Sequence, residues 1–257
     1  MAPQIDYLTE VFLPIARAGF GLPNGVAIDV ERRGYFPKGG GVVKVTVPHM
    51  QTKLKPIYLL DRGRVEEEIK IRAFYAGNCP RWVAEGMAEA AVKELSKADV
   101  DGRRLKPRVE IVEDSNAIDA ASGILIVAKT STNCIFGGSA LGSRKEKSHK
   151  TGKNAAKEII SALQSGGCVD GWLQDQVILY MALADGVSEI ITGCLTLHTQ
   201  TAIGIAEQMT GAKFEVKQLD TIESTLANAE EHGSIYGGKG LIVGRHTIRC
   251  HGIGYTG

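Results

Sequence analysis

The stretch GCVDGWLQDQVILYMALADGVSEIITGCLTLHTQTAIGIAEQMTGAK, residues 167–213, predicts a helix, a tight turn, a strand and a second helix. An apolar stripe at helical spacing indicates the first helix: Val177, Ile178, Met181 and Leu183. Asp185 and Gly186 then supply the turn chemistry that ends it. Apolar residues indicate the strand (Ile190, Ile191, Leu195, Leu197) and the inner face of the second helix (Ile203, Ile205, Ala206, Met209).

A histidine, His198, stands where this strand is expected to pass into the second helix, with Thr199 as the expected N-cap. The first turn of a helix presents free N–H donors and the positive end of its dipole, which attract phosphate. A neutral imidazole there is placed to attack phosphorus through its free nitrogen. The alternative is a hydrogen-bonded structural histidine, and spacing alone favours it, because a lone histidine says little about role.

Three residues of the first helix share one of its faces. Trp172, Asp175 and Gln176 are spaced i, i+3 and i+4. Without further information, ordinary helix packing is the preferred interpretation of Trp172 and Gln176.

The composition describes an ordinary globular chain with no global attraction to nucleic acid. The 257 residues are 44% hydrophobic and 23% charged, with a net charge of +1, so an RNA site must be a local patch. Five scattered cysteines without CxxC spacing favour reduced thiols over a disulfide frame or a zinc site. No apolar stretch is long enough to span a bilayer and no signal-peptide pattern is visible, so we expect a nuclear or cytoplasmic protein.

The rest of the chain predicts a helix, a hairpin and a separate αβ unit. An amphipathic helix is expected at residues 4–18, kinked at Pro14, and a hairpin at 26–47 that turns through three consecutive glycines. After a linker at 53–56, the patterns predict strands at 65–74, 109–112, 124–128 and 134–136, and helices at 81–96 and 155–163. Beyond residue 218 they predict a helix at 221–229 and strands at 241–243 and 247–250.

Basic residues form three groups that are candidates for contact with phosphate. They are Arg32, Arg33 and Lys38; Arg103, Arg104, Lys106 and Arg108; and Arg144, Lys145, Lys147, Lys150 and Lys153. The alternative is a solvated surface, which we expect for the second group because that is the commoner fate of charge runs. The third group stays open between RNA binding, nuclear targeting and plain solvation. His232, His246 and His251 are too loosely spaced to predict a metal site.

Several stretches of the sequence resemble the RNA 3′-terminal phosphate cyclase family, in the family's order. They are MAPQIDYLTEVFLPIA, RRGYFPKGGGVVKV, TSTNCIFGGSALG, LQDQVILYMALADG and TGCLTLHTQTAIGIAEQMTGAKFEVK. The resemblance implies ATP-dependent conversion of an RNA 3′-phosphate end to a 2′,3′-cyclic phosphodiester. It also implies an α+β fold of repeated βα units, like that of the enolpyruvyl transferases, with an inserted small thioredoxin-like αβ domain.

The resemblance divides the chain into three parts. Residues 1–55 are expected to form a partial βα repeat of the large domain, 56–166 the inserted domain, and 167–257 the last repeat with the histidine motif. Family members carry a first repeat, and part of the next, before the helix at 4–18. The sequence is therefore expected to be a carboxy-terminal portion, whose uncovered apolar surface is exposed or covered by a second copy in a homodimer.

The resemblance also assigns roles to residues. His198 is expected to attack the α-phosphorus of ATP, release pyrophosphate and carry AMP to the RNA 3′-phosphate, with Mg²⁺ offsetting the triphosphate charge. Trp172, Asp175 and Gln176 are expected to line the nucleotide pocket, with the indole stacked on adenine. Pro3 is expected to border the same pocket. Many relatives have tyrosine where Trp172 stands, so an aromatic face is kept while a hydroxyl is lost.

Other functions compete with the cyclase. One is a non-catalytic cyclase-like protein of ribosomal RNA processing; such relatives lack the histidine of the HTQTA run, so His198 speaks against this class. Another is a fragment that only binds RNA. The enolpyruvyl-transferring synthases share the fold, and a fold alone does not decide the chemistry. The HTQTA run and the Asp175–Gln176 pair favour the cyclase.

Overall fold

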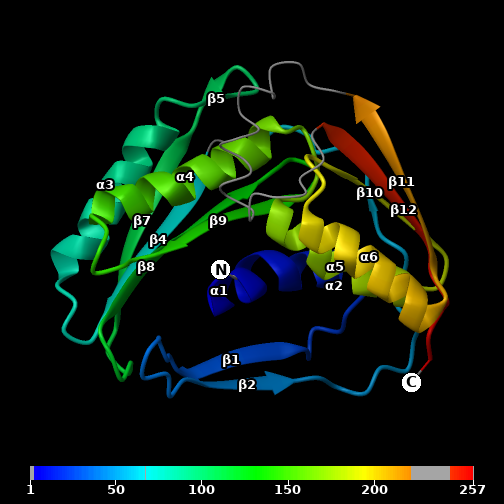
Figure 1. Ribbon diagram of the computed structural model, residues 1–257, viewed down its shortest axis with the longest axis horizontal. Coiled ribbons are helices and arrows are strands. Elements are labelled where there is room, and N and C mark those ends of the chain that lie inside the picture. Colours follow the sequence, from blue (N-terminus) through cyan, green and yellow to red (C-terminus); the bar gives the residue numbers. More distant parts are fainter. Residues whose placement is uncertain (1–2, 67, 221–243, 257) are drawn as a thin grey trace.

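The computed structural model describes residues 3–66, 68–220 and 244–256 and shows a mixed α+β chain (Figure 1). Its helices in chain order are α1 (Ile5–Tyr7), the π-helical turn η1 (Leu8–Phe12), α2 (Leu13–Phe20), α3 (Arg81–Leu95), α4 (Ser148–Gln164), α5 (Gly171–Leu183) and α6 (Leu197–Thr210). Its strands are β1 (Ala27–Arg32), β2 (Val42–Thr46), β3 (Tyr58–Leu59), β4 (Glu68–Ala76), β5 (Asp99–Val100), β6 (Arg103–Arg104), β7 (Lys106–Asp114), β8 (Ala121–Lys129), β9 (Ile135–Leu141), β10 (Val187–Thr192), β11 (Lys213–Asp220) and β12 (Arg245–His251).

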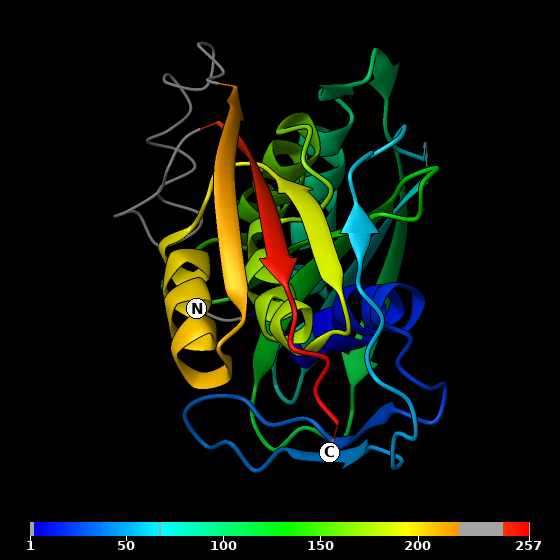
Figure 2. The same ribbon diagram turned by 90° about the vertical axis from the view of Figure 1, so that its right-hand side faces the viewer.

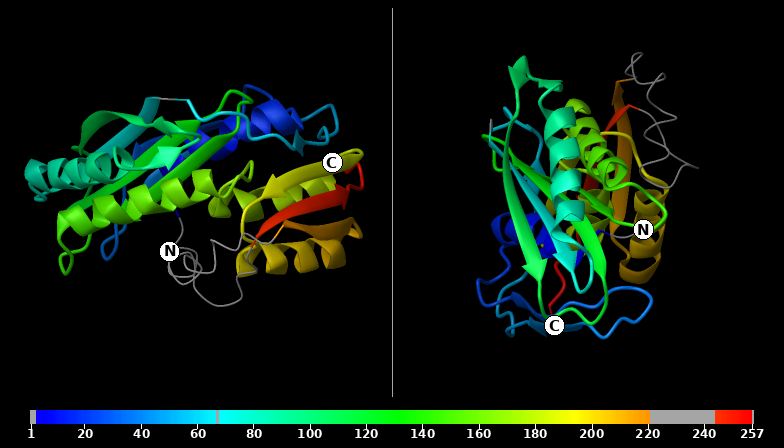
Figure 3. Two further views of the ribbon diagram at one scale, coloured as in Figure 1. Left: turned by 90° about the horizontal axis from the view of Figure 1, so that it is seen from above. Right: turned by 90° about the vertical axis from the view of Figure 1, so that its left-hand side faces the viewer.

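One four-stranded sheet has the order β7-β4-β8-β9, with β4 and β7 parallel and the other pairs antiparallel. α3 and α4 cover one face of it, and the helix at residues 5–20 lies on the other (Figure 3). Strand β8 is buried on both faces because its side chains alternate between the two layers. Ile124 and Ile126 pack with α3 and α4, whereas Leu125 and Val127 pack with Tyr7 and Val11.

The helix expected at residues 4–18 runs from Ile5 to Phe20 as α1, η1 and α2. The π-helical turn Leu8–Phe12 is followed by Leu13, so that Pro14 is the second residue of α2. Proline removes one amide from the helical ladder, so an irregular turn in front of it is physically expected. The buried face of this helix, Tyr7, Val11, Ile15 and Phe20, joins the core of the second half of the chain.

The second four-stranded sheet has the order β11-β12-β10-β3, and Figure 2 shows the four strands side by side. β3 pairs in parallel with β10, although the elements from β4 to α4, here called the β4–α4 unit, lie between them in the sequence. Helices α5 and α6 pack against this sheet through Val177, Met181 and Ala206, which join Ile190 and Ile248 in one core. The sheet and its two helices position the site described below.

The hairpin predicted at residues 26–47 is present as β1 and β2, which pair antiparallel with a bulge at Val30–Arg32. Of the three glycines in its turn, Gly39 and Gly40 adopt positive φ and Gly41 does not. Val43, Val45 and Val47 are exposed on it. The three basic residues singled out there have partners within the chain: Arg33 pairs with Asp6 at 2.6 Å, Lys38 pairs with Asp119 at 3.6 Å, and Arg32 donates to the carbonyl of Gly40 at 2.7 Å.

Two details of the stretch 167–213 differ from expectation. The strand ends at Thr192, so Leu195 and Leu197 lie outside it. On α6, Ala206 is buried and Ile203 half-buried, but Ile205 and Met209 point to solvent and Met209 is 81% exposed. The cause is the helical period, because residues 205 and 209 lie one turn apart on a different face from residues 203 and 206.

The other predicted elements of the β4–α4 unit are present, with α4 longer than expected because it begins at Ser148. The strand expected at 247–250 is part of β12. The expected helix at 221–229, the strand at 241–243 and His232 lie outside the described residues. No helix within the described ranges combines the length and apolar character that a bilayer crossing demands.

Candidate active site at the start of helices α5 and α6

Helix α5 begins at a buried carboxylate. Asp170 is its N-cap and accepts hydrogen bonds from the amides of Trp172 and Leu173, both at 2.9 Å. The same carboxylate accepts from the hydroxyl of Tyr7 at 2.6 Å and from the amide of Gly137 at 2.8 Å. Burial raises its pKa, while these four donors favour the charged form. Asp170 therefore joins the amino-terminal helix, β9 and α5 at one point.

The loop that leads into α6 is held by a glutamine of α5. Gln174 is buried, donates to the hydroxyl of Thr192 and to the carbonyl of Cys194, and accepts from the amide of Thr196 at 3.0 Å. All of its side-chain bonds go to residues from the end of β10 to the N-cap of α6. This segment is thus fixed from the helix beside it, and it carries the start of α6.

His198 lies in the first turn of α6, where the sequence places it, and its side chain is exposed. The N-cap is Thr196 and not the expected Thr199: Thr196 Oγ1 accepts from the amide of Thr199 at 3.2 Å. Thr199 is buried and exchanges a hydrogen bond between hydroxyls with Thr196 at 2.9 Å. The capping bond satisfies the amide of Thr199. The amides of Leu197 and His198 come before the first hydrogen bonds of the helix, so they point outward from its start.

Asp175 and Gln176 lie on the face of α5 that the spacing predicted, and both are half-buried. Burial raises the pKa of Asp175, and the nearby charge of His198 lowers it. Asp175 is therefore near enough to His198 for the charge of the imidazole to affect the pKa of the carboxyl. The Oε1 atom of Gln176 is buried and has no hydrogen-bond partner among the described residues. A buried orphan acceptor costs free energy, so it is a marker for a ligand that donates to it.

Trp172 is half-buried at the start of α5 and packs against the core that contains Val177 and Ile190. Its indole Nε1–H donates to Glu158 of α4, so the polar edge of the ring is occupied by the protein. Glu158 is buried and also accepts from the amide of Ser139 at 2.7 Å. Burial raises the pKa of Glu158 to about 8. The indole is thereby held in one orientation.

Pro3 is half-buried and precedes Gln4, the N-cap of α1. The bond between Tyr7 and Asp170 places the helix that follows Pro3 against the start of α5. The two ends of the expected pocket are therefore tied by a contact that sequence reasoning did not name. Asp170, Gln174 and Glu158 were not identified from the sequence as residues of the site. An aspartate directly before a helix is an N-cap signal, and it was available for Asp170; nothing local marks Gln174 or Glu158.

Within residues 3–66, 68–220 and 244–256, no three His, Cys, Asp or Glu side chains stand close enough to hold an ion. His246 is buried, with its Nδ1 at 3.0 Å from the carbonyl of Gly244. The cysteines that the structure describes are all free thiols.

Comparison with known proteins identifies the family. The family model described as RNA 3′-terminal phosphate cyclase matches residues 1–216. The chain belongs to the RNA 3′-terminal phosphate cyclase family. The match covers every residue of the candidate site, from Pro3 to His198.

Relatives named as RNA 3′-terminal phosphate cyclases occur in distant organisms. A probable cyclase of Dictyostelium discoideum is 38% identical over 220 residues, which are 85% of this chain and 49% of the relative. The cyclase of Drosophila melanogaster is 36% identical over 84% of this chain and 58% of its own length. The cyclase of Pyrobaculum aerophilum is 33% identical over 99% and 64%. The chain spans about half to two thirds of the length of the cyclases it matches.

Proposed function

We propose that this chain carries the nucleotide-transfer site of an RNA 3′-terminal phosphate cyclase and converts RNA 3′-phosphate ends to 2′,3′-cyclic phosphodiesters with ATP. The observation that carries the proposal is the placement of His198. Its imidazole is exposed on the first turn of α6, beside a carboxylate of α5 and next to free helix amides. That environment suits a nucleophile that attacks phosphorus.

The proposed reaction has three steps. A ring nitrogen of His198 attacks the α-phosphorus of ATP; a P–N bond forms, the bond to the β-phosphate breaks, and pyrophosphate leaves. An oxygen of the RNA 3′-phosphate then displaces the imidazole and takes the AMP. The 2′-hydroxyl attacks the activated phosphorus, loses its proton to solvent, and AMP departs. One positioned histidine thus divides a difficult displacement into steps with good leaving groups.

The described residues fit a nucleotide. Glu158 holds the N–H edge of Trp172 and so orients the indole that is proposed to stack on adenine. The orphan Oε1 of Gln176 is an acceptor for a ligand N–H, and the free amides of α6 suit the phosphates. Asp175 is proposed to stabilise the charged imidazole, and Pro3 to border the base. Mg²⁺, held by the triphosphate in this proposal, offsets its negative charge.

Labelled ATP tests the proposal directly. The 257-residue chain with Mg²⁺ and ATP labelled in the α-phosphate should acquire an acid-labile adenylate, and His198→Ala should abolish it. His251→Ala is the matched control, because His251 is exposed on β12. An unlabelled wild-type chain that still binds RNA would favour the RNA-binding fragment. Co-purification with pre-ribosomal particles without adenylation would favour the non-catalytic class.

The finer description of the fold is also a proposal. A thioredoxin-like insert is supported by the order β7-β4-β8-β9 and by the parallel β4–α3–β7 connection. The repeated βα units and the boundaries at residues 55 and 166 are proposed with it. A homodimer through the exposed valines of the hairpin is a further proposal, which analytical ultracentrifugation tests.

A further inference from the structure

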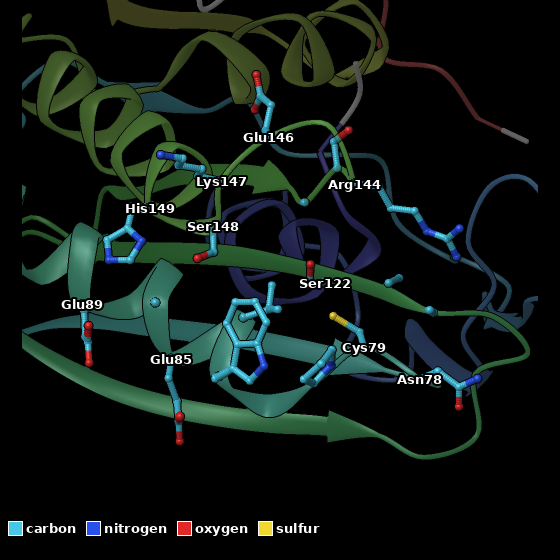
Figure 4. Close-up of a pocket in the computed structure, with 18 residues that line it drawn as sticks. Asn78, Cys79, Glu85, Glu89, Ser122, Arg144, Glu146, Lys147, Ser148 and His149 are labelled. Carbon is cyan, nitrogen blue, oxygen red and sulfur yellow. The ribbon is translucent and has the colours of Figure 1, made fainter.

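A cavity of about 750 Å³ lies between the first turns of α3 and α4, away from His198 (Figure 4). We call it the α3–α4 cavity. It is lined by the start of α3, by residues 120–122 at the entry to β8, and by residues 142–149 between β9 and α4. α4 runs from this cavity toward α5 (Figure 1), and its 17 residues span about 25 Å. The cavity is therefore a helix length away from the candidate active site.

Two helices open on this cavity without side-chain caps. The N-cap of α3 is Pro80 and that of α4 is Lys147, and neither makes a side-chain capping bond. Both helix starts therefore offer free amides and the positive ends of their dipoles to the same space. Such an arrangement favours an anionic group.

The side chains around the opening add positive charge. Arg144 and Lys147 line the cavity and have no ion pair in the part of the chain that the structure describes; Figure 4 shows their side chains extending in opposite directions from the 142–149 segment. The acidic lining is partly neutralised, because Glu85 pairs with Arg81 at 2.8 Å and Glu146 with Lys150 at 2.7 Å. Glu85 and Glu89 extend from α3 away from the 142–149 loop (Figure 4).

A serine hydroxyl in the cavity wall has no hydrogen-bond partner among the described residues. Ser122 is 8% exposed, lines the cavity, and its side chain makes no hydrogen bond to a described residue. The hydroxyl is not one of the fully buried unpaired atoms, so it reaches the open space of the cavity, where a polar ligand group can bond to it. It is independent of the helix starts, because it belongs to β8.

The cavity also presents an aromatic surface. Trp82, on the first turn of α3, is 66% exposed and lines the opening. An exposed indole next to an anion site is the combination that single-stranded nucleic acids bind, by stacking a base on the ring and placing phosphate on basic groups.

We propose that the α3–α4 cavity binds single-stranded RNA upstream of the 3′ end that His198 acts on. Trp82 stacks on a base, and Arg144, Lys147 and the helix amides hold its phosphate. This inference rests on the proposed function, because it assigns a second contact to the same substrate. A stacked strand advances about 3.4 Å per nucleotide, so about 8 nucleotides span the length of α4.

Substrate length tests the proposal. The 257-residue chain is titrated with fluorescent RNA carrying a 3′-phosphate, either about 12 nucleotides long or a trinucleotide that is too short to span α4. Trp82→Ala should weaken binding of the longer RNA about 5- to 100-fold and leave the trinucleotide unchanged. Trp82→Phe should retain most of the affinity. The double variant Arg144→Ala/Lys147→Ala should lower the slope of log affinity against log salt by about 1.4.

Matched controls separate this site from general charge and from the catalytic site. Lys93→Ala removes an exposed lysine of the same helix, α3, outside the cavity lining. In a Trp172→Phe background Trp82 is the only tryptophan, so quenching of its emission by RNA reports the contact directly.

Two results would overturn the proposal: affinity for the longer RNA equal in the Trp82→Ala and Lys93→Ala variants, or an equal loss for the trinucleotide. The second would indicate a pocket for a single nucleotide. Adenylation of His198 is measured separately and without RNA. Length-dependent RNA binding with no adenylation would therefore contradict the proposed function and support this site. Adenylation of His198 with no length-dependent RNA binding would support the proposed function and contradict this site.

Discussion

The indole of Trp172 donates its N–H to Glu158, a carboxyl that is 3% exposed and comes from another helix. Burial raises the pKa of this carboxyl from 4.5 to about 8. A carboxyl whose pKa is higher in the folded state stabilises the fold at low pH. That contribution is lost as the pH rises from the unfolded value through the folded one.

Glu158→Gln should therefore change the pH dependence of stability. Near pH 5 the variant should be less stable by about 1 kcal/mol, because the amide keeps only one of the two acceptors used by Trp172 and Ser139. Near pH 9 it should be more stable by about 1–3 kcal/mol, because it avoids a buried charge. Urea unfolding at both pH values measures this, with the exposed Glu89→Gln as control. A constant difference across the range would contradict the assignment.

Tyr7→Phe should destabilise the chain by about 1–3 kcal/mol. It removes the 2.6 Å hydrogen bond to Asp170, which is buried and caps α5. Tyr58→Phe, at an exposed tyrosine, should leave the unfolding free energy unchanged. Thermal unfolding followed by circular dichroism compares the two. Equal midpoints would show that the bond does not hold the amino-terminal helix on α5.

Gln176 and Gln174 lie on the same helix and should respond in opposite ways to substitution by methionine. Gln176→Met removes an orphan acceptor and should leave the apo chain as stable or about 1 kcal/mol more stable, while weakening ATP binding about tenfold. Gln174→Met should destabilise the chain by about 2–4 kcal/mol. It leaves the carbonyl of Cys194 and the amide of Thr196, in the loop before α6, without their hydrogen bonds to this side chain. Denaturant unfolding and calorimetric ATP titration separate the effects. Tight ATP binding by Gln176→Met would argue against its contact with nucleotide.

Thr196→Ala should cost about 1–2 kcal/mol and slow adenylation of His198. The threonine caps α6 and bonds to Thr199, so its loss loosens the turn that carries the imidazole. Thr196→Ser keeps the hydroxyl and should restore both properties. Stability and label incorporation are measured on the same preparations. Normal labelling by an unstable alanine variant would mean that the cap holds the helix but not the histidine.

Local patterns in the sequence predicted most elements around the site. The face shared by Trp172, Asp175 and Gln176 follows from helical spacing, and the start of α6 at His198 follows from the change of period. The N-cap was placed three residues late. The sequence has threonines at 196 and 199, and only the course of the loop, set by Gln174, decides which hydroxyl faces the free amides.

What the sequence by itself determined is the order and type of the elements, the position of the histidine in a helix start, and the family. Tertiary structure alone decided that Glu158 holds Trp172, that Tyr7 meets Asp170, and that the starts of α3 and α4 line one cavity. The reason is physical. Backbone periodicity and turn chemistry act between neighbours along the chain, whereas these contacts join residues that only the packing of sheets and helices brings together.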